Sequence, residues 1–225
     1  MDSSGAVLVI APHPDDEVLG AGGTMARLSS EGHEVFVLIV TRADPSIFPD
    51  YSVEEGRAEA LEADELLGVR KTLFLEGFPA ALLDTVPQAH LNRAVGEVIE
   101  QIGPRSLLIP FVGDLHMDHR KVAEAALVAA RPDGTHTVRS IWAYETVSET
   151  NWNAAPFTPG FLPNTFVDIS GHLEPKLEAM RRYASQLKPF PHERSLEALE
   201  ARARSRGATV GFNAAEAFVL IRQSI

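Results

Sequence analysis

The chain has 225 residues and a formal net charge of −11, with 31 acidic against 20 basic side chains, and this balance argues against nucleic-acid or anionic-membrane partners. Because it contains no cysteine, disulfides, thiolate metal sites and cysteine nucleophiles are excluded. No apolar run approaches membrane-spanning length, so we expect one compact domain over residues 1–225, in the cytoplasm and without a membrane span.

Short apolar runs alternate with longer segments of helical period, which predicts βαβ units in an α/β fold with a mostly parallel sheet. In chain order we expect a strand at 6–11, a helix at 22–31, a strand at 34–41, a helix at 53–67, a strand at 72–75, a helix at 88–102, a strand at 106–110, a helix at 119–130 and a strand at 140–144. Beyond these we expect a strand at 166–170 and helices at 173–187 and 195–206, while 214–222 fits a strand or a helix.

Polar side chains gather directly after two of the predicted strands. They are His13, Asp15, Asp16 and Glu17 in the first cluster and Asp114, His116, Asp118 and His119 in the second. Such groups cost stability at the end of a buried strand unless a partner compensates them, and a divalent metal is the most economical partner. The two clusters therefore predict halves of one metal site.

Topology supports this prediction, because ligands of open parallel sheets bind outside the carboxyl ends of the strands. A catalytic zinc site keeps three protein ligands and leaves a position for water, and the best three here are His13, Asp16 and His119. A remaining carboxylate could then take a proton from water, and a remaining imidazole could stabilise an oxyanion or protonate a leaving amine. The implied reaction is hydrolysis of an amide or ester carbonyl.

The segments Pro12-His13-Pro14-Asp15-Asp16-Glu17 and His116-Met117-Asp118-His119 together resemble the LmbE/PIG-L family of zinc-dependent N-acetylglucosaminyl deacetylases. The likeness continues through residues 144–146, 163–169 and 183–186. It implies a Rossmann-like three-layer α/β/α fold and removal of an acetyl group from a small amino-sugar substrate, with release of acetate. Family analogy also implies a homo-oligomer, either a trimer or a hexamer.

Carried over position by position, the resemblance implies that His13, Asp16 and His119 bind Zn²⁺, although other divalent metals suit the same ligands. It makes Asp15 the general base. His116 would polarise the oxyanion or act as general acid, with Asp118 orienting its ring. Arg57 is the nearest match to a family arginine that holds the sugar or its aglycone; an ion pair on its acidic helix is the alternative.

Simpler roles compete with these assignments. Asp15 or Asp16 could cap the following helix, Asp114 could fix its loop through backbone hydrogen bonds, and Glu17 could serve structure alone. Three rival functions also stand. They are a non-haem iron oxygenase with the same ligands, a dinucleotide-binding domain suggested by Gly20-Ala21-Gly22-Gly23, and a zinc-retaining binding protein without turnover.

Overall fold

The computed structural model describes residues 5–132 and 137–224. Strands and helices alternate along most of the chain, as the hydrophobic pattern predicts. In chain order the elements are β1 (Val7–Ala11), α1 (Asp16–Ser30), β2 (Val35–Ile39), α2 (Val53–Leu66), β3 (Lys71–Phe74), η1 (Leu83–Thr85), α3 (Gln88–Ile102), β4 (Ser106–Pro110), α4 (Met117–Ala129), β5 (Ser140–Tyr144), β6 (Thr165–Asp168), α5 (Leu173–Arg182), α6 (Leu196–Val210) and β7 (Ala215–Gln223).

The strands form one seven-stranded sheet in the order β3-β2-β1-β4-β5-β7-β6. The first five strands of this order pair in parallel, whereas β7 runs antiparallel to both β5 and β6. From β1 the chain builds outward to β2 and β3, and it then returns to place β4 on the other side of β1. The carboxyl ends of β1 and β4 therefore flank the point where the strand order reverses, which is the usual ligand crevice of such sheets.

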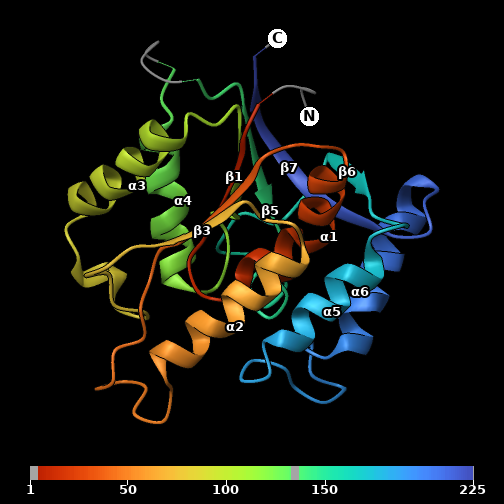
Figure 1. Ribbon diagram of the computed structural model, residues 1–225, viewed down its shortest axis with the longest axis horizontal. Coiled ribbons are helices and arrows are strands. Elements are labelled where there is room, and N and C mark those ends of the chain that lie inside the picture. Colours follow the sequence, from red (N-terminus) through yellow and green to blue (C-terminus); the bar gives the residue numbers. More distant parts are fainter. Residues whose placement is uncertain (1–4, 133–136, 225) are drawn as a thin grey trace.

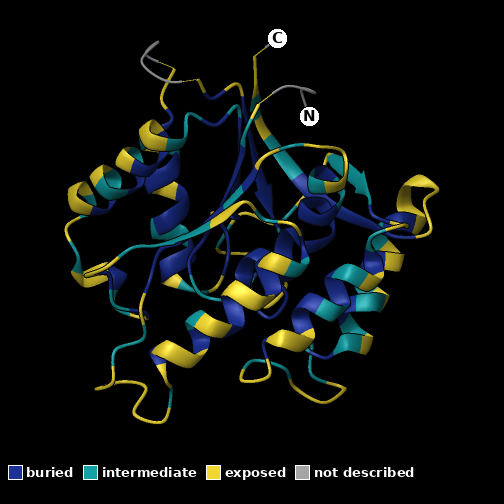
Figure 2. Cartoon of the chain, in the orientation of Figure 1, coloured by how far each residue is buried: buried dark blue, intermediate teal, exposed yellow. Residues whose placement is uncertain are grey.

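Helices cover both faces of the sheet (Figure 1). Helices α1, α2, α5 and α6 share one hydrophobic core with the sheet, and α3 and α4 share the other. Successive residues of β1 alternate between the cores, since Val9 packs in the first and Ile10 in the second. Figure 2 shows burial concentrated in the strands and on the helix faces turned toward them. The predicted three-layer α/β/α architecture is confirmed.

Several element boundaries differ from the sequence-based expectations. Helix α1 begins at Asp16 rather than at residue 22, so Gly20, Gly22 and Gly23 lie inside a helix and not in a phosphate-binding loop. This placement removes the main support for a dinucleotide-binding domain. Helix α5 ends at Arg182, earlier than residue 187. Residues 214–222, for which the sequence leaves strand or helix open, form most of strand β7, which pairs with β5 and β6 along its length.

The glycines of α1 let this helix approach the sheet closely. A Cβ atom on Gly20 would lie 2.2 Å from Cδ2 of Tyr144, a distance that no side chain tolerates. The Tyr144 ring cannot easily move away, because it is fully buried and its hydroxyl donates to the backbone oxygen of Ile10 at 2.9 Å. The start of α1 is thereby held against the carboxyl end of β1, where the first polar cluster lies.

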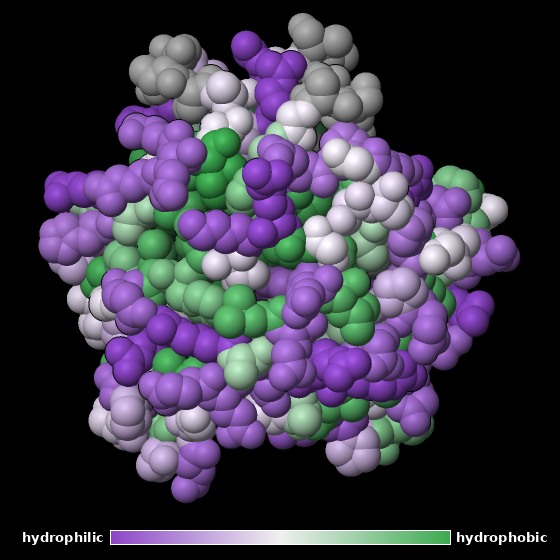
Figure 3. All heavy atoms as spheres, in the orientation of Figure 1, coloured by the Kyte–Doolittle hydropathy of each residue, from purple (hydrophilic) through white to green (hydrophobic). Residues whose placement is uncertain are grey.

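Hydrophilic side chains cover most of the face shown in Figure 3, with apolar groups visible between them. Many residues of α2 are exposed on this side of the molecule. Among the described residues, none of the helices combines the length and the apolar character needed to span a bilayer.

Candidate metal centre and active site

The structure brings the three predicted ligands together at the switch point of the sheet. His13 lies in the turn after β1, Asp16 is the first residue of α1, and His119 lies in the first turn of α4. Each offers one nitrogen or oxygen atom, and these atoms lie within 4.8 Å of one another. The group can hold a metal ion, as the spacing of the two clusters predicts.

The donor atoms of this group fit a cation. The Oδ2 atom of Asp16 lies 3.1 Å from Nδ1 of His13 and 3.2 Å from Nε2 of His119. The Oδ1 atom of Asp16 and Nε2 of His119 are buried and have no hydrogen-bond partner in the described structure. Buried polar atoms are normally paired, so these orphaned atoms at a set of nitrogen and oxygen donors favour a bound metal ion.

The pKa values of Asp16 and His119 are set by burial and by the contacts between these side chains. Burial raises the pKa of Asp16, but His119 and His13 outweigh this effect and hold it well below its usual range. Burial lowers the pKa of His119, yet the Asp16 and Asp114 carboxylates raise it to about 10. The carboxylate is therefore available to a cation, and a metal bound at Nε2 of His119 would replace the proton that these carboxylates favour.

Asp114 orients the ring of His119. Its Oδ2 atom lies 2.8 Å from Nδ1 of His119, and its Oδ1 atom accepts a hydrogen bond from Thr150 Oγ1 at 2.6 Å. The sequence predicts that Asp114 fixes its loop through backbone hydrogen bonds, whereas its side chain contacts a candidate ligand. When a metal is bound, a carboxylate on one ring nitrogen holds the proton there and fixes the ring with its opposite nitrogen toward the metal.

His116 and Asp118 lie beside the candidate ligands in a different arrangement from the expected one. The Asp118 carboxylate lies 3.0 Å from His13 Nε2 and 4.0 Å from His116 Nδ1, so its closer imidazole partner is His13. Backbone N–H groups of Ala81 and Leu83 donate to the same carboxylate. His13, His116 and Asp118 form a second group of metal-ligating type, but these bonds already occupy the carboxylate of that group.

The tautomer of His116 follows from its position at the N-cap of α4. Its Nδ1 atom accepts a hydrogen bond from the backbone N–H of Asp118 at 3.1 Å. Burial and the nearby His13 lower the pKa of His116 to about 4, which leaves the imidazole neutral at pH 7. A neutral ring that accepts at Nδ1 carries its proton on Nε2, so that nitrogen can donate a hydrogen bond.

Asp15 occupies a strained backbone position beside Asp16. Its φ angle is 109°, which L-residues rarely adopt, and its side chain does not cap α1. Burial raises the pKa of Asp15 to about 7, although Arg194 acts in the opposite direction. The capping role that competes for Asp15 is therefore absent, and a carboxyl group that titrates near neutral pH can exchange protons during a reaction.

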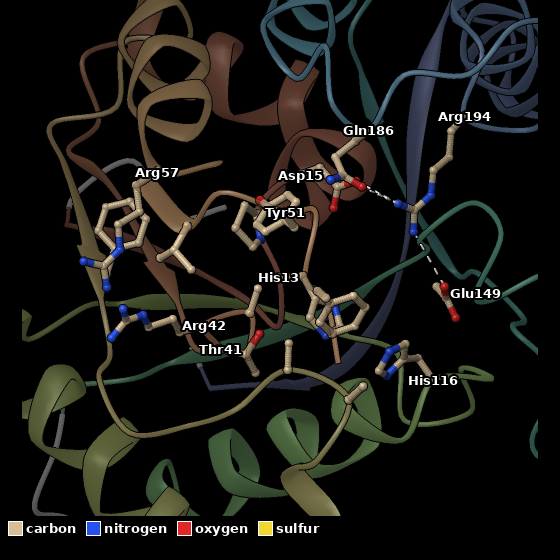
Figure 4. Close-up of a pocket in the computed structure, with 17 residues that line it drawn as sticks. His13, Asp15, Thr41, Arg42, Tyr51, Arg57, His116, Glu149, Gln186 and Arg194 are labelled. Atoms are coloured by element: carbon tan, nitrogen blue, oxygen red, sulfur yellow. Dashed lines mark hydrogen bonds and ion pairs between the residues drawn. The ribbon is translucent and has the colours of Figure 1, made fainter. Parts of the chain in front are cut away.

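These groups open into a pocket of about 240 Å³, drawn in Figure 4. Arg42 and Arg57 lie at one side of the pocket and His116 at the other, with His13 and Asp15 between them. Arg57 makes an ion pair with Glu76 and stacks 5.0 Å from the centroid of Phe74. Arg57 thus lines the pocket, and its ion-pair partner lies in the segment after β3 rather than on its own acidic helix.

Comparison with known proteins decides the family. The family described as GlcNAc-PI de-N-acetylase (PIG-L) matches residues 8–130, which contain both polar clusters. The chain belongs to the PIG-L family. A diacetylchitobiose deacetylase from Thermococcus kodakarensis is 30% identical over 197 residues, covering 83% of this chain and 71% of that protein.

Solved structures of related proteins share the whole fold. A conserved protein from Thermus thermophilus superposes with a TM-score of 0.79 at 28% identity, covering 97% of this chain and 96% of that one. The N,N'-diacetylchitobiose deacetylase from Pyrococcus horikoshii gives a TM-score of 0.76 at 25% identity, covering 96% of this chain and 84% of that one. The likeness to this PIG-L fold thus includes β6, α5, α6 and β7, beyond the matched residues 8–130.

Sequence reasoning missed residues that reach the PIG-L pocket from segments that follow β5. Arg194 and Gln186 line the pocket, as does Glu149 from the segment after β5. Tyr183 donates a hydrogen bond to the buried Glu17, whose other oxygen accepts from the backbone N–H of Asp15 at 3.2 Å. Only the Tyr183-Ala184-Ser185-Gln186 segment carries a sequence signal; nothing around Arg194 or Glu149 indicates a site.

Proposed function

We propose that this protein is a zinc-dependent hydrolase that removes the acetyl group from an N-acetylglucosamine-type amino sugar and releases acetate. The observation that carries the proposal is the group of His13, Asp16 and His119, in which Asp16 and His119 are buried and each leave one atom without a hydrogen-bond partner, next to Asp15 and His116. Nitrogen and oxygen donors suit zinc, and three protein ligands leave room for a reacting molecule. Membership of a de-N-acetylase family supports the reaction.

In this proposal His13, Asp16 and His119 hold the zinc ion, which when bound supplies a Lewis acid that activates water and polarises the acyl oxygen. Asp15 takes the proton of the attacking water, since its carboxylate faces the pocket and its pKa of about 7 suits both uptake and release of a proton. Asp15 can then return that proton to the departing amine, which completes the cleavage of the amide.

His116 stabilises the negative charge that develops on the acyl oxygen. Its Nδ1 atom accepts from the Asp118 backbone, so the Nε2 proton is the group available for a hydrogen bond to that oxygen. The neutral state favoured by its pKa of about 4 makes His116 a hydrogen-bond donor and not the acid that protonates the amine. Asp118 acts through His13, because its carboxylate contacts Nε2 of His13 and so fixes the orientation of that ring.

The substrate class follows from the relatives and the pocket. Curated relatives include a diacetylchitobiose deacetylase and a deacetylase of an inositol-linked 2-acetamido-2-deoxy-glucopyranoside. In this chain the pocket extends from the catalytic groups to Arg57 and Tyr51, which gives space for a group attached to the sugar. We propose that Arg57 contacts the sugar or its aglycone; the trimeric or hexameric state stays a prediction.

Acetate release from a panel of N-acetylglucosaminides, with metal-replete protein, tests the proposal. We expect turnover by the wild type, loss of turnover with retained metal in Asp15→Ala, and loss of metal in His119→Ala. His90→Ala is the matched control, because His90 is exposed on α3 away from the pocket. If the wild type binds zinc but releases no acetate, the protein is a zinc-retaining binding protein and not a hydrolase. Turnover that needs oxygen would favour a non-haem iron oxygenase.

A further inference from the structure

Arg194 reaches the pocket from the segment between α5 and α6. It immediately precedes Ser195, whose buried side chain caps α6, so its backbone is anchored to the start of a helix. Only 20% of its side chain is exposed. Figure 4 shows its guanidinium on the side of the pocket opposite Arg42 and Arg57, extending toward Asp15 and Glu149.

The guanidinium of Arg194 contacts several partners at once. Its Nη1 atom donates to Asp15 Oδ2 at 3.0 Å and lies 3.4 Å from Gln186 Oε1. Its Nε atom donates to Ser148 Oγ at 3.0 Å, and its Nη2 atom lies 3.6 Å from Glu149 Oε1. Because its three nitrogens have separate partners, the planar guanidinium has a fixed orientation, which the single ammonium group of a lysine would not have.

The Asp15 carboxylate depends on this contact for its position. Within residues 5–132 and 137–224, Arg194 is the only residue that makes a hydrogen bond or ion pair to the Asp15 side chain. The contact engages Oδ2, and the described residues make no hydrogen bond to Oδ1. The backbone of Asp15 is strained at a φ of 109°, so packing around this residue, and not backbone preference, has to define where its carboxylate points.

We propose that Arg194 is the positioning residue of the catalytic base, holding the Asp15 carboxylate in one rotamer so that Oδ1 faces the attacking water. The inference rests on the proposed function of Asp15. It assigns a catalytic contribution to a residue outside the matched segment 8–130. A misplacement of a reacting group by about 1 Å can cost about 100-fold in rate, so the effect falls on turnover more than on binding.

Arg206 provides a matched control on the neighbouring helix α6. It makes a two-point ion pair with Glu145 at 2.7 and 2.6 Å, and 23% of its side chain is exposed, close to the value for Arg194. Arg206 does not line the pocket of Asp15. Replacing either arginine by alanine removes a partly buried ion pair, but only the Arg194 change affects the base.

The test compares Arg194→Ala with Arg206→Ala in metal-replete protein. For Arg194→Ala we expect kcat to fall about 10- to 100-fold, while KM stays within about threefold and metal content is unchanged. Added guanidinium should restore part of kcat in Arg194→Ala only. In an Asp15→Asn background the Arg194 change should not lower the residual rate of acetate release any further, because the two residues act through one group.

Different results would overturn the inference in distinct ways. A rise in KM at constant kcat makes Arg194 a substrate contact, and an equal loss in Arg206→Ala makes its role structural. Crystal structures of the metal-bound wild type and Arg194→Ala test the inference without an assay, since we expect the Asp15 carboxylate to rotate. An unmoved carboxylate overturns it, whereas a wild type that releases no acetate contradicts the proposed function separately.

Discussion

Replacing Asp114 should weaken metal binding without removing any candidate ligand. Asp114 is fully buried, and its Oδ2 atom lies 2.8 Å from Nδ1 of His119. In Asp114→Asn the amide oxygen can still accept from Nδ1, but the charge is lost. In Asp114→Ala the ring loses its acceptor, so the tautomer with a free Nε2 atom is no longer favoured.

The expected magnitude follows from the geometry of this contact. Changes in the partner of a ligating histidine typically lower metal affinity about 10- to 100-fold, which corresponds to about 1.4 to 2.7 kcal/mol. We expect Asp114→Asn near the lower value because an acceptor remains, and Asp114→Ala near the upper value. Thr150→Val removes only the second hydrogen bond of Asp114 and should cost less than either.

Competition between the metal-free protein and a calibrated chelator would measure these affinities. Asp168→Asn is the control for the change of charge, because Asp168 lies on β6 and hydrogen-bonds to Ser170 away from the pocket. Thermal unfolding of each metal-free variant would check that the fold persists. Affinities of both Asp114 variants within about twofold of the wild type would refute the proposed orienting role, since the expected minimum is about tenfold.

Burial raises the pKa of Asp64 from 3.8 to about 7, although Thr72 donates to its carboxylate. When an acid has a higher pKa in the folded state than in the unfolded state, the protein loses stability as pH rises through the range between the two pKa values. Asp64→Asn should therefore be more stable than wild type at pH 8, by at most about 4 kcal/mol, but not at pH 3.5. Urea unfolding of the metal-free proteins at both values would show this, and a pH-independent difference would contradict it. Gly20→Ala should destabilise by about 1 to 3 kcal/mol through its clash with Tyr144. Gly96→Ala in α3, where the new Cβ would lie 3.8 Å from Ala129 of α4, should instead stabilise by about 0.5 to 1 kcal/mol, and equal melting temperatures would argue against the close packing of α1. Arg57→Ala should raise KM about tenfold with little change in kcat, and steady-state kinetics with unchanged KM would remove Arg57 from the substrate site.

The sequence alone determined the layers of the fold and the centre of the site. Buried strands such as β1 and β4 appear as continuous apolar runs, and the helices between them carry a different period. Parallel strands have their carboxyl ends at one edge of the sheet, so polar residues after β1 and β4 could be expected to meet. The meeting of His13, Asp16 and His119 follows from this rule.

Only the tertiary structure decided which groups surround that centre. Asp15 meets Arg194 at a sequence separation of 179 residues, and Asp118 contacts His13 at a separation of 105. The hydrophobic pattern also did not predict that α1 starts at Asp16, because the apolar period becomes clear only after the glycines. Periodicity reports which face of an element is buried, whereas contacts between single side chains depend on how distant loops pack, and no local pattern encodes that packing.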